Sequence, residues 1–242
     1  MKSIKNKNHH GAEAQNTSYQ FSTALKSAIT NNTFWDEIPV GPYQFMIKRI
    51  RDTDRLLESI TDSHFNKDEW LPYWAELWPS SLALAEFIIE IKEMINRKNI
   101  LEIGCGLGLA GIAATACGAQ VLFTDYDPYA LEFTQTNFRR NFKRPAAVQS
   151  MDWRKPACLK PFDLILGADV LYEKRWLTAV LGVIGQCLKP GGTALIAEPN
   201  RSIAGKFFAL VSEKGWKRKA LLKRIHVNDK LHMVTIHRIQ TC

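Results

Sequence analysis

From Asn99 onward the chain alternates between runs of residues typical of strands and runs typical of helices. The strand-like runs are NILEIG, QVLFTD, AAVQSMD, FDLILGAD and GTALIAEP. Helix-like runs follow most of them, at LAGIAATAC, DPYALEFTQTNFRRNF, KRWLTAVLGVIGQCL and SIAGKFFALVSEKG. This alternation predicts an α/β fold with a mostly parallel, doubly wound sheet. WKRKALLKRIH and LHMVTIHRI, separated by Val-Asn-Asp-Lys, predict an antiparallel strand pair at one edge.

The glycine-rich stretch LEIGCGLGLAGI lies at the turn after the first of these strands. In an open α/β sheet, ligands bind beyond the carboxyl ends of the strands, where this turn is expected. Gly106, Gly108 and Gly111 spell the G-x-G-x-x-G pattern of a dinucleotide fold. Preceded by Glu102, the glycines Gly104, Gly106 and Gly108 instead spell an acidic-x-G-x-G-x-G loop, which would bind S-adenosylmethionine.

The carboxylate of Glu102 favours S-adenosylmethionine. Inside the glycine turn it would oppose a pyrophosphate but suit an ammonium and a sulfonium. Gly111 is then expected to be a helix residue kept small for packing against the sheet. Asp125, at the end of the second strand, can accept hydrogen bonds from the ribose of either cofactor and does not distinguish them. Asp127 precedes Pro128 and is expected to cap a helix.

The chain before the glycine loop differs in character. The polar residues 1–20 predict a mobile tail, in which His9 and His10 form a surface pair rather than a metal site. FWDEIPVGPYQFMIKRI predicts a β-hairpin outside the main sheet, and DTDRLLESI is weakly helical.

Three tryptophans and two prolines in DEWLPYWAELWPSS stand just ahead of the helical run SLALAEFIIEIKEMI. Ser80 or Ser81 is expected to cap that helix. Core packing is the expected role of Trp70 and Trp74. The prolines favour an irregular lid, in which Trp78 contacts the cofactor.

The composition supports one sizeable core, with 242 residues of which 46% are hydrophobic. The cysteines at positions 105, 117, 158, 187 and 242 form no C-x-x-C pair, and their odd number makes a poor disulfide framework. We therefore expect a reducing, cytoplasmic setting. No apolar run approaches about 18 residues, so a soluble protein that does not enter a membrane is expected.

The net charge of +8 is compatible with acidic partners or nucleic acid, but its lysines and arginines are scattered, which favours a solvated surface. The basic groups RRNFKR and KRKALLKR are expected to end a helix and to protect an edge strand, respectively. If either one is functional, it would attract an acidic protein substrate or RNA phosphates.

Several motifs together resemble the seven-stranded, class I methyltransferases that use S-adenosylmethionine. They are LEIGCGLGLAGI, TDYDPYAL, the MDW after the third strand and ADVLYE after the fourth. PYWAELWPSS with Asp-Val-Leu-Tyr resembles the protein lysine methyltransferases of this class, in particular those that modify the electron transfer flavoprotein β subunit. The sequence Glu-Pro-Asn-Arg at 198–201 departs from the loop of those relatives, which leaves the substrate open.

This resemblance implies a Rossmann-like sheet of order 3-2-1-4-5-7-6, with strand 7 antiparallel and an N-terminal hairpin and helix extension. It also implies three parts of the chain: the tail at 1–20, a hairpin and lid extension at 21–79, and an S-adenosylmethionine-binding methyltransferase domain at 80–242. A monomer is expected.

The resemblance also assigns the site. The glycine loop with Glu102 would hold the amino acid moiety of the cofactor, and Asp125 the ribose. Asp152 would face the adenine amino group with Trp153 beside the ring, while Trp78 would close over the methionine end. No metal ligand is expected. Asp169 and Tyr172 match the acidic-x-x-aromatic motif that borders the target amine, and are the expected catalytic residues.

Methyl transfer to lysine requires a neutral amine, although free lysine has a pKa of about 10.4. Burial beside a sulfonium disfavours the ammonium form. Asp169 would then accept an N–H bond from the amine, and Tyr172 would form an aromatic wall. The alternatives are that Asp169 caps the helix beginning near Glu173 and that Tyr172 only packs beneath that helix.

The leading hypothesis is thus methylation of a lysine in a protein substrate. Methylation of a small molecule or RNA by the same fold is the alternative, although no prolines follow Asp169 as in the Asn/Asp-Pro-Pro-Tyr signature of nucleic-acid amino methyltransferases. A non-catalytic S-adenosylmethionine-binding module would bind the cofactor without turnover. A nicotinamide oxidoreductase is the least favoured alternative.

Overall fold

The computed structural model describes residues 23–58, 71–158 and 160–241, and within them the strands form two sheets. The larger sheet has seven strands in the order β5-β4-β3-β6-β7-β9-β8. β3 to β7 are parallel, whereas β9 runs antiparallel to both of its neighbours. The expected order 3-2-1-4-5-7-6 is thereby confirmed. The strands are β3 Asn99–Ile103, β4 Gln120–Asp125, β5 Ala147–Ser150, β6 Phe162–Ala168, β7 Leu188–Glu198, β8 Lys217–Val227 and β9 Lys230–Gln240.

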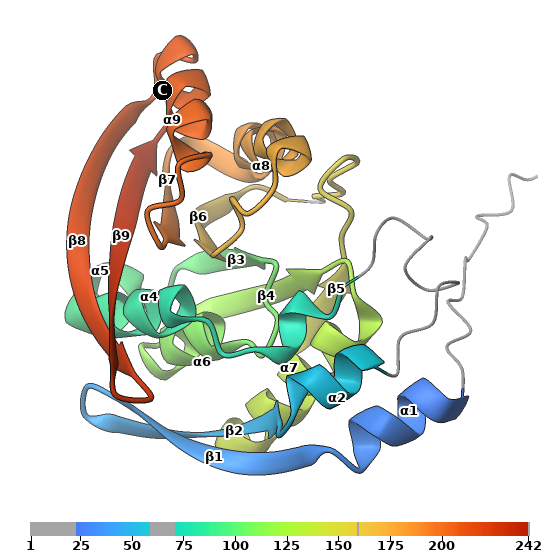
Figure 1. Cartoon of the computed structure of the whole chain (residues 1–242). Coiled ribbons are helices and arrows are strands. Elements are labelled where there is room, and N and C mark those ends of the chain that lie inside the picture. Colours follow the sequence, from blue (N-terminus) through green and yellow to red (C-terminus); the bar gives the residue numbers. More distant parts are fainter. Residues whose placement is uncertain (1–22, 59–70, 159, 242) are drawn as a thin grey trace, which may run out of the picture.

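Helices cover both faces of this sheet, as expected for a doubly wound fold (Figure 1). One face is packed by α4 Pro79–Glu90, α6 Leu109–Ala116 and α7 Pro128–Phe142, with the short α5 Lys92–Ile95 following α4. The other face is packed by α8 Lys174–Cys187 and α9 Ala204–Glu213. The inner strand β3 is buried along its length after Asn99, because it has a hydrophobic layer on each side.

The predicted hairpin is present and lies outside the main sheet. Its strands β1 Thr33–Val40 and β2 Tyr43–Ile50 pair in antiparallel register. Two asparagines of α7 join it to the domain: Asn137 accepts a hydrogen bond from the Lys48 backbone N–H at 2.7 Å, and Asn141 accepts one from Met46 at 3.0 Å. α1 Thr23–Thr30 and α2 Thr53–Glu58 precede and follow the hairpin and lie at the same end of it (Figure 1), and α2 confirms the weak helix.

The two predicted helix caps have different outcomes. The carboxylate of Asp127 accepts the Tyr129 backbone N–H at 2.8 Å at the start of α7, which confirms the first. The prediction that Ser80 or Ser81 caps α4 is wrong. That helix begins at Pro79 and has Trp78 at its N-cap position, with no side-chain cap. Proline suits a first helical position, because its ring sets φ and it has no N–H to satisfy.

The cysteine analysis is also wrong in one respect, since Cys158 and Cys187 form a disulfide with their Cα atoms 5.6 Å apart. α8 runs back to the start of β6, where Phe162 and Leu188 pair, and this brings the two cysteines together. Their separation of 29 residues hides this proximity in the sequence. Cys105 and Cys117 are free and buried. The cytoplasmic setting stays a prediction, and the disulfide does not support it.

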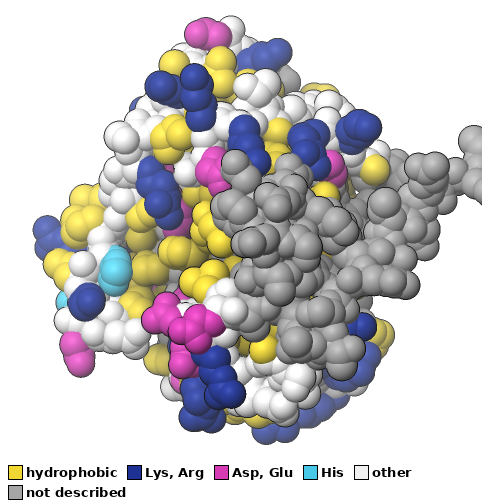
Figure 2. Space-filling model, turned by 45° about the vertical axis from the view of Figure 1, so that its right-hand side comes forward, with side chains coloured by type: hydrophobic (Ala, Val, Ile, Leu, Met, Phe, Trp, Pro, Cys, Tyr) yellow, Lys and Arg dark blue, Asp and Glu magenta, His cyan; other side chains and the backbone are white. Residues whose placement is uncertain are grey.

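The basic groups lie where they were expected. Arg139 and Arg140 occupy the last turn of α7, and the lysines of KRKALLKR lie on β8, the exposed edge strand of the main sheet. Figure 2 shows lysines and arginines scattered among apolar and acidic side chains over one face. Among the described helices, none is long and apolar enough to cross a membrane. The tail with His9 and His10 lies outside the described residues, as does Trp70.

Candidate active site

A cavity of about 350 Å³ opens beyond the carboxyl ends of β3, β4 and β6. Every predicted site residue except Gly108 lines it, which brings together residues far apart in the sequence. Gly108 instead precedes α6 with φ of 81°, and a Cβ there would lie 2.9 Å from the hydroxyl of Thr134. Gly108 therefore packs against Thr134 on the side of the loop away from the cavity. The predicted residues in the wall are Trp78, Glu102, Gly104, Gly106, Asp125, Asp152, Trp153, Asp169 and Tyr172.

Gly104 brings the backbone of the loop against an aromatic ring. Its φ is 59°, in the left-handed region, and a Cβ would approach the ring of Trp153 to 2.9 Å. Any side chain at this position would therefore meet both backbone strain and a steric clash. Gly104 and Trp153 together form one closely packed part of the cavity wall.

Glu102 lies at the base of the loop with only 3% of its surface exposed. Its carboxylate accepts a hydrogen bond from the Gly111 backbone N–H at 3.2 Å. Burial raises the pKa of Glu102 to about 8, and the nearby charge of Asp125 acts in the same direction. The wall therefore contains a buried carboxyl group for which a bound cation would be a favourable partner.

Asp125 is the last residue of β4 and connects this strand to the glycine loop. One carboxylate oxygen accepts the Gly106 N–H at 3.0 Å, and the other accepts the Asp127 N–H at 3.0 Å. Burial raises its pKa, while these backbone hydrogen bonds lower it. A backbone hydrogen bond from Tyr126 also lowers this pKa, so three of the roughly four acceptor positions of the carboxylate are used and one remains for a hydroxyl.

Asp152 and Trp153 form the wall beyond β5. Both Asp152 oxygens accept from Arg154 Nε, at 2.9 and 3.0 Å. Although partial burial raises the pKa of Asp152, the hydrogen bonds and charge of Arg154 outweigh it and hold that pKa below its usual value. The ring of Trp153 meets Trp176 edge-on at 5.9 Å. An ionised carboxylate thus lies beside a fixed aromatic surface.

Asp169 follows β6 with φ of 56°, outside the usual regions for a residue with a side chain. Its Oδ1 accepts hydrogen bonds from Arg201 Nε at 3.0 Å and Nη2 at 2.9 Å. Burial raises the pKa of Asp169, against the lowering effect of Arg201. The alternative role as a cap of α8 is not observed, since Glu173 occupies that N-cap position.

Tyr172 packs against Tyr73, with ring centroids 5.1 Å apart. Burial raises the pKa of the Tyr172 phenol, so this hydroxyl stays protonated at neutral pH. Tyr73 begins the 3-10 helix η1 Tyr73–Ala75, and its backbone oxygen accepts from Trp78 Nε1 at 2.8 Å. Trp74 stacks on Tyr129 in the core, as predicted, and also lines the cavity.

Sequence reasoning missed several residues of the wall, above all Arg201, Tyr73 and Trp176. Tyr73 lies within the aromatic run already assigned to a lid, so the neighbouring tryptophans were a usable signal. Arg201 had no such signal, because its role depends on the position of Asp169 across the sheet. Among the described residues, no group of three or more His, Cys, Asp or Glu side chains could hold a metal ion.

A family model described as "Lysine methyltransferase" matches residues 67–214, which include the cavity and most of the parallel sheet. This chain belongs to that family. The lysine methyltransferase of the electron transfer flavoprotein β subunit from Xenopus laevis is 32% identical over 135 residues, covering 54% of either chain. Protein N-lysine methyltransferase METTL21A from Danio rerio is 33% identical over 129 residues, covering 50% of this chain and 58% of its own.

These alignments span about half the length of the curated relatives. Among solved structures, the 16S rRNA N2 G1207 methyltransferase of T. thermophilus, in complex with AdoMet and guanosine, superposes with a TM-score of 0.58 at 15% identity. The superposition covers 87% of this chain and 51% of the T. thermophilus chain. At this identity the likeness establishes a methyltransferase fold. The substrate has to be argued from the site.

Proposed function

We propose that this chain transfers a methyl group from S-adenosylmethionine to the ε-amino group of a lysine in a protein substrate. The observation that carries the proposal is that one cavity is lined both by the acidic glycine loop and by Asp169 and Tyr172. Family membership supports the reaction class. The names of the two curated relatives support a lysine acceptor.

The residues present fit this cofactor. The buried carboxyl group of Glu102 lacks a cationic partner among the described residues, and an ammonium or sulfonium would supply one. Asp125 lines the cavity and keeps acceptor capacity for a ribose hydroxyl, and the Trp153 ring offers a flat surface for a base. A pyrophosphate at the same loop would meet Glu102 and Asp125 instead, which argues against a nicotinamide cofactor.

When bound, the sulfonium supplies an electrophilic methyl group. The residues of this chain then have to present an amine with a free lone pair, in line with that methyl. Asp169 is buried at the cavity wall and can accept an N–H bond from the amine, which orients it. The rings of Tyr172 and Tyr73 form an aromatic wall that excludes water and tolerates a partly charged amine.

The proposal can be tested by incubating the protein with cell extract and radiolabelled S-adenosylmethionine, followed by digestion with nuclease or protease. We expect label that survives nuclease, is lost to protease and is recovered as methyllysine after acid hydrolysis. Nuclease-sensitive or low-molecular-weight label would favour an RNA or small-molecule acceptor. Cofactor binding without label in any fraction would favour a non-catalytic module.

Monomeric state and cytoplasmic location are part of the same proposal and require separate tests. Sedimentation of the purified protein at several concentrations addresses the first. Location can be followed with a fluorescent fusion. Neither result bears on the identity of the acceptor, which the extract experiment addresses directly.

A further inference from the structure

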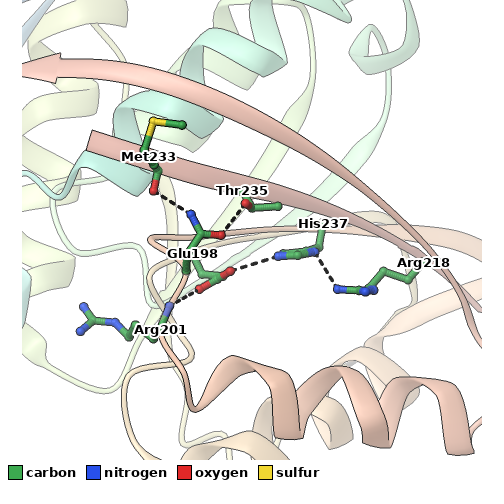
Figure 3. Close-up of polar contacts among 7 residues, drawn as sticks. Glu198, Arg201, Arg218, Met233, Thr235 and His237 are labelled. Atoms are coloured by element: carbon green, nitrogen blue, oxygen red, sulfur yellow. Dashed lines mark hydrogen bonds and ion pairs between the residues drawn. The ribbon is translucent and has the colours of Figure 1, made fainter. Parts of the chain in front are cut away.

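The turn after β7 is tied to the neighbouring strand β9 by side chains that the proposed reaction does not use (Figure 3). Asn200 donates to the Met233 backbone oxygen at 3.0 Å and accepts from the Thr235 hydroxyl at 2.6 Å. Glu198 lies 3.1 Å from His237 Nε2. Asn200 also has a φ of 61°, so its side-chain contacts hold an unusual backbone conformation. Together these contacts fix the direction in which Arg201 leaves the turn.

The contact between Arg218 and His237 shows which group donates in the hydrogen bond between His237 and Glu198. Arg218 Nη1 lies 3.3 Å from His237 Nδ1, and a guanidinium can only donate, so Nδ1 is the acceptor. The proton of His237 is therefore on Nε2 and is donated to Glu198 Oε1. The other oxygen, Oε2, accepts the Arg201 backbone N–H at 2.9 Å. A buried carboxylate thus holds the main chain at Arg201, as Figure 3 shows.

The guanidinium of Arg201 contacts Asp169 in an asymmetric way. Both donors, Nε and Nη2, reach the same oxygen, Oδ1. No described residue hydrogen-bonds to Oδ2, which belongs to a side chain lining the cavity. The Asp169 backbone N–H also donates to the Ala197 backbone oxygen at 2.8 Å, so Asp169 and Arg201 are both attached to the end of β7. One oxygen is held by the arginine, and the other is left for a ligand.

We propose that Arg201 is the positioning residue for Asp169, directing Oδ2 toward the acceptor amine and keeping the carboxylate ionised. This inference rests on the proposed function, because it assigns a role within the same site. The side chain of Asp169 is 6% exposed and that of Arg201 is 37% exposed, so the arginine connects a buried anion to solvent. The other charge acting on Asp169 is that of Glu198, which has the same sign as Asp169 and would favour its protonation.

The test compares Arg201→Ala with Arg201→Met, in which the methionine fills part of the space of the arginine without its charge. We expect both variants to lower kcat about 100-fold, while the affinity for S-adenosylmethionine stays within about threefold. Added guanidinium ion should restore Arg201→Ala in part and leave Arg201→Met unchanged, because only alanine leaves room for the ion. Arg224→Ala, on the exposed edge strand, is the matched control and should behave like the wild-type protein.

A second readout does not depend on turnover. The carboxyl carbon of Asp169 can be followed by ¹³C NMR during a pH titration, with the signal assigned by its loss in Asp169→Asn. We expect Asp169 to titrate at a higher pH in Arg201→Ala than in the wild-type protein, since a nearby cation favours the ionised form. The proposal is overturned if that titration does not move, or if Arg201→Ala keeps the wild-type kcat. Should the wild-type protein label no acceptor, the proposed function fails, and the titration alone still decides whether Arg201 controls Asp169.

Discussion

The carboxylate of Glu102 accepts a hydrogen bond from the backbone N–H of Gly111 at 3.2 Å. This contact explains why the glycines of LEIGCGLGLAGI also match a dinucleotide-binding pattern, although Gly111 has a different role. Gly111 completes a dinucleotide pattern by its spacing, but its place in α6 brings it against Glu102 and the ring of Phe123. It is a packing residue that holds the acidic residue of the loop in position.

Gly111→Ala is therefore expected to destabilise the protein. A Cβ at Gly111 would lie 2.3 Å from Phe123 and 2.4 Å from a Glu102 oxygen, so two buried side chains would have to move. The free energy of unfolding should fall by about 1–3 kcal/mol, as is usual for overpacking, which urea denaturation would measure. Gly182→Ala, within α8 and with no atom within 4 Å of the added carbon, is the control and should stabilise or be neutral. Equal effects of the two substitutions would contradict this account.

Glu102 should make the stability of the protein without cofactor depend on pH. Burial raises its pKa from 4.5 to about 8, so between these values the folded protein holds a proton that the unfolded chain releases. The free energy of unfolding therefore falls as the pH rises from about 5 to about 8. Urea denaturation across this range should show a smaller decrease for Glu102→Gln. A residual slope is expected from Asp125, whose pKa burial also raises.

The affinity for S-adenosylmethionine should change with pH in the opposite direction. A cationic ligand prefers the ionised carboxylate, so binding below about pH 8 requires Glu102 to lose its proton. We expect affinity to rise with pH, and calorimetry in buffers of different ionisation enthalpy should detect the released proton near pH 7. Loss of this proton release in Glu102→Gln would identify the group. The same release in that variant would assign it to another residue.

The sequence predicted which side chains lie close together where the sheet topology alone brings them to one edge. Glu102 and Asp125 lie on adjacent parallel strands, and Asp169 follows β6, on the other side of β3. Since parallel strands end at the same edge of a sheet, a correct alternation of strands and helices is enough to bring these carboxylates together. The order of the strands required more, and came from the resemblance to a known family.

Contacts that depend on loop direction could not be predicted in this way. Arg201 reaches Asp169 across 32 positions of sequence, and it does so because Glu198 and Asn200 hold the turn against β9. The Cys158–Cys187 disulfide depends likewise on where α8 ends relative to β6. No local pattern of residues reports such distances.

Asp169→Asn should separate turnover from cofactor binding. Asparagine keeps the size of the side chain but removes the charge that orients the amine and can help to carry away its proton. We expect transfer to fall by about 100-fold or more, with the affinity for S-adenosylmethionine within a few-fold of wild type. Asp163→Asn, at the opposite end of β6, is the control and should leave the transfer rate unchanged. Comparable losses of rate and affinity would assign Asp169 to cofactor binding or folding instead.

Trp78→Phe tests the aromatic run in front of α4. Trp78 lines the cavity, and its Nε1–H donates to the Tyr73 backbone oxygen at 2.8 Å, so phenylalanine removes part of the wall and the bond that holds Tyr73. We expect the affinity for S-adenosylmethionine, measured by calorimetry, to fall by about tenfold, in line with the loss of one hydrogen bond and of aromatic contact area. Trp216→Phe, at a tryptophan that packs near Gly185 of α8, is the control and should bind normally. Unchanged affinity in Trp78→Phe would remove Trp78 from the site and leave it a purely structural role before α4.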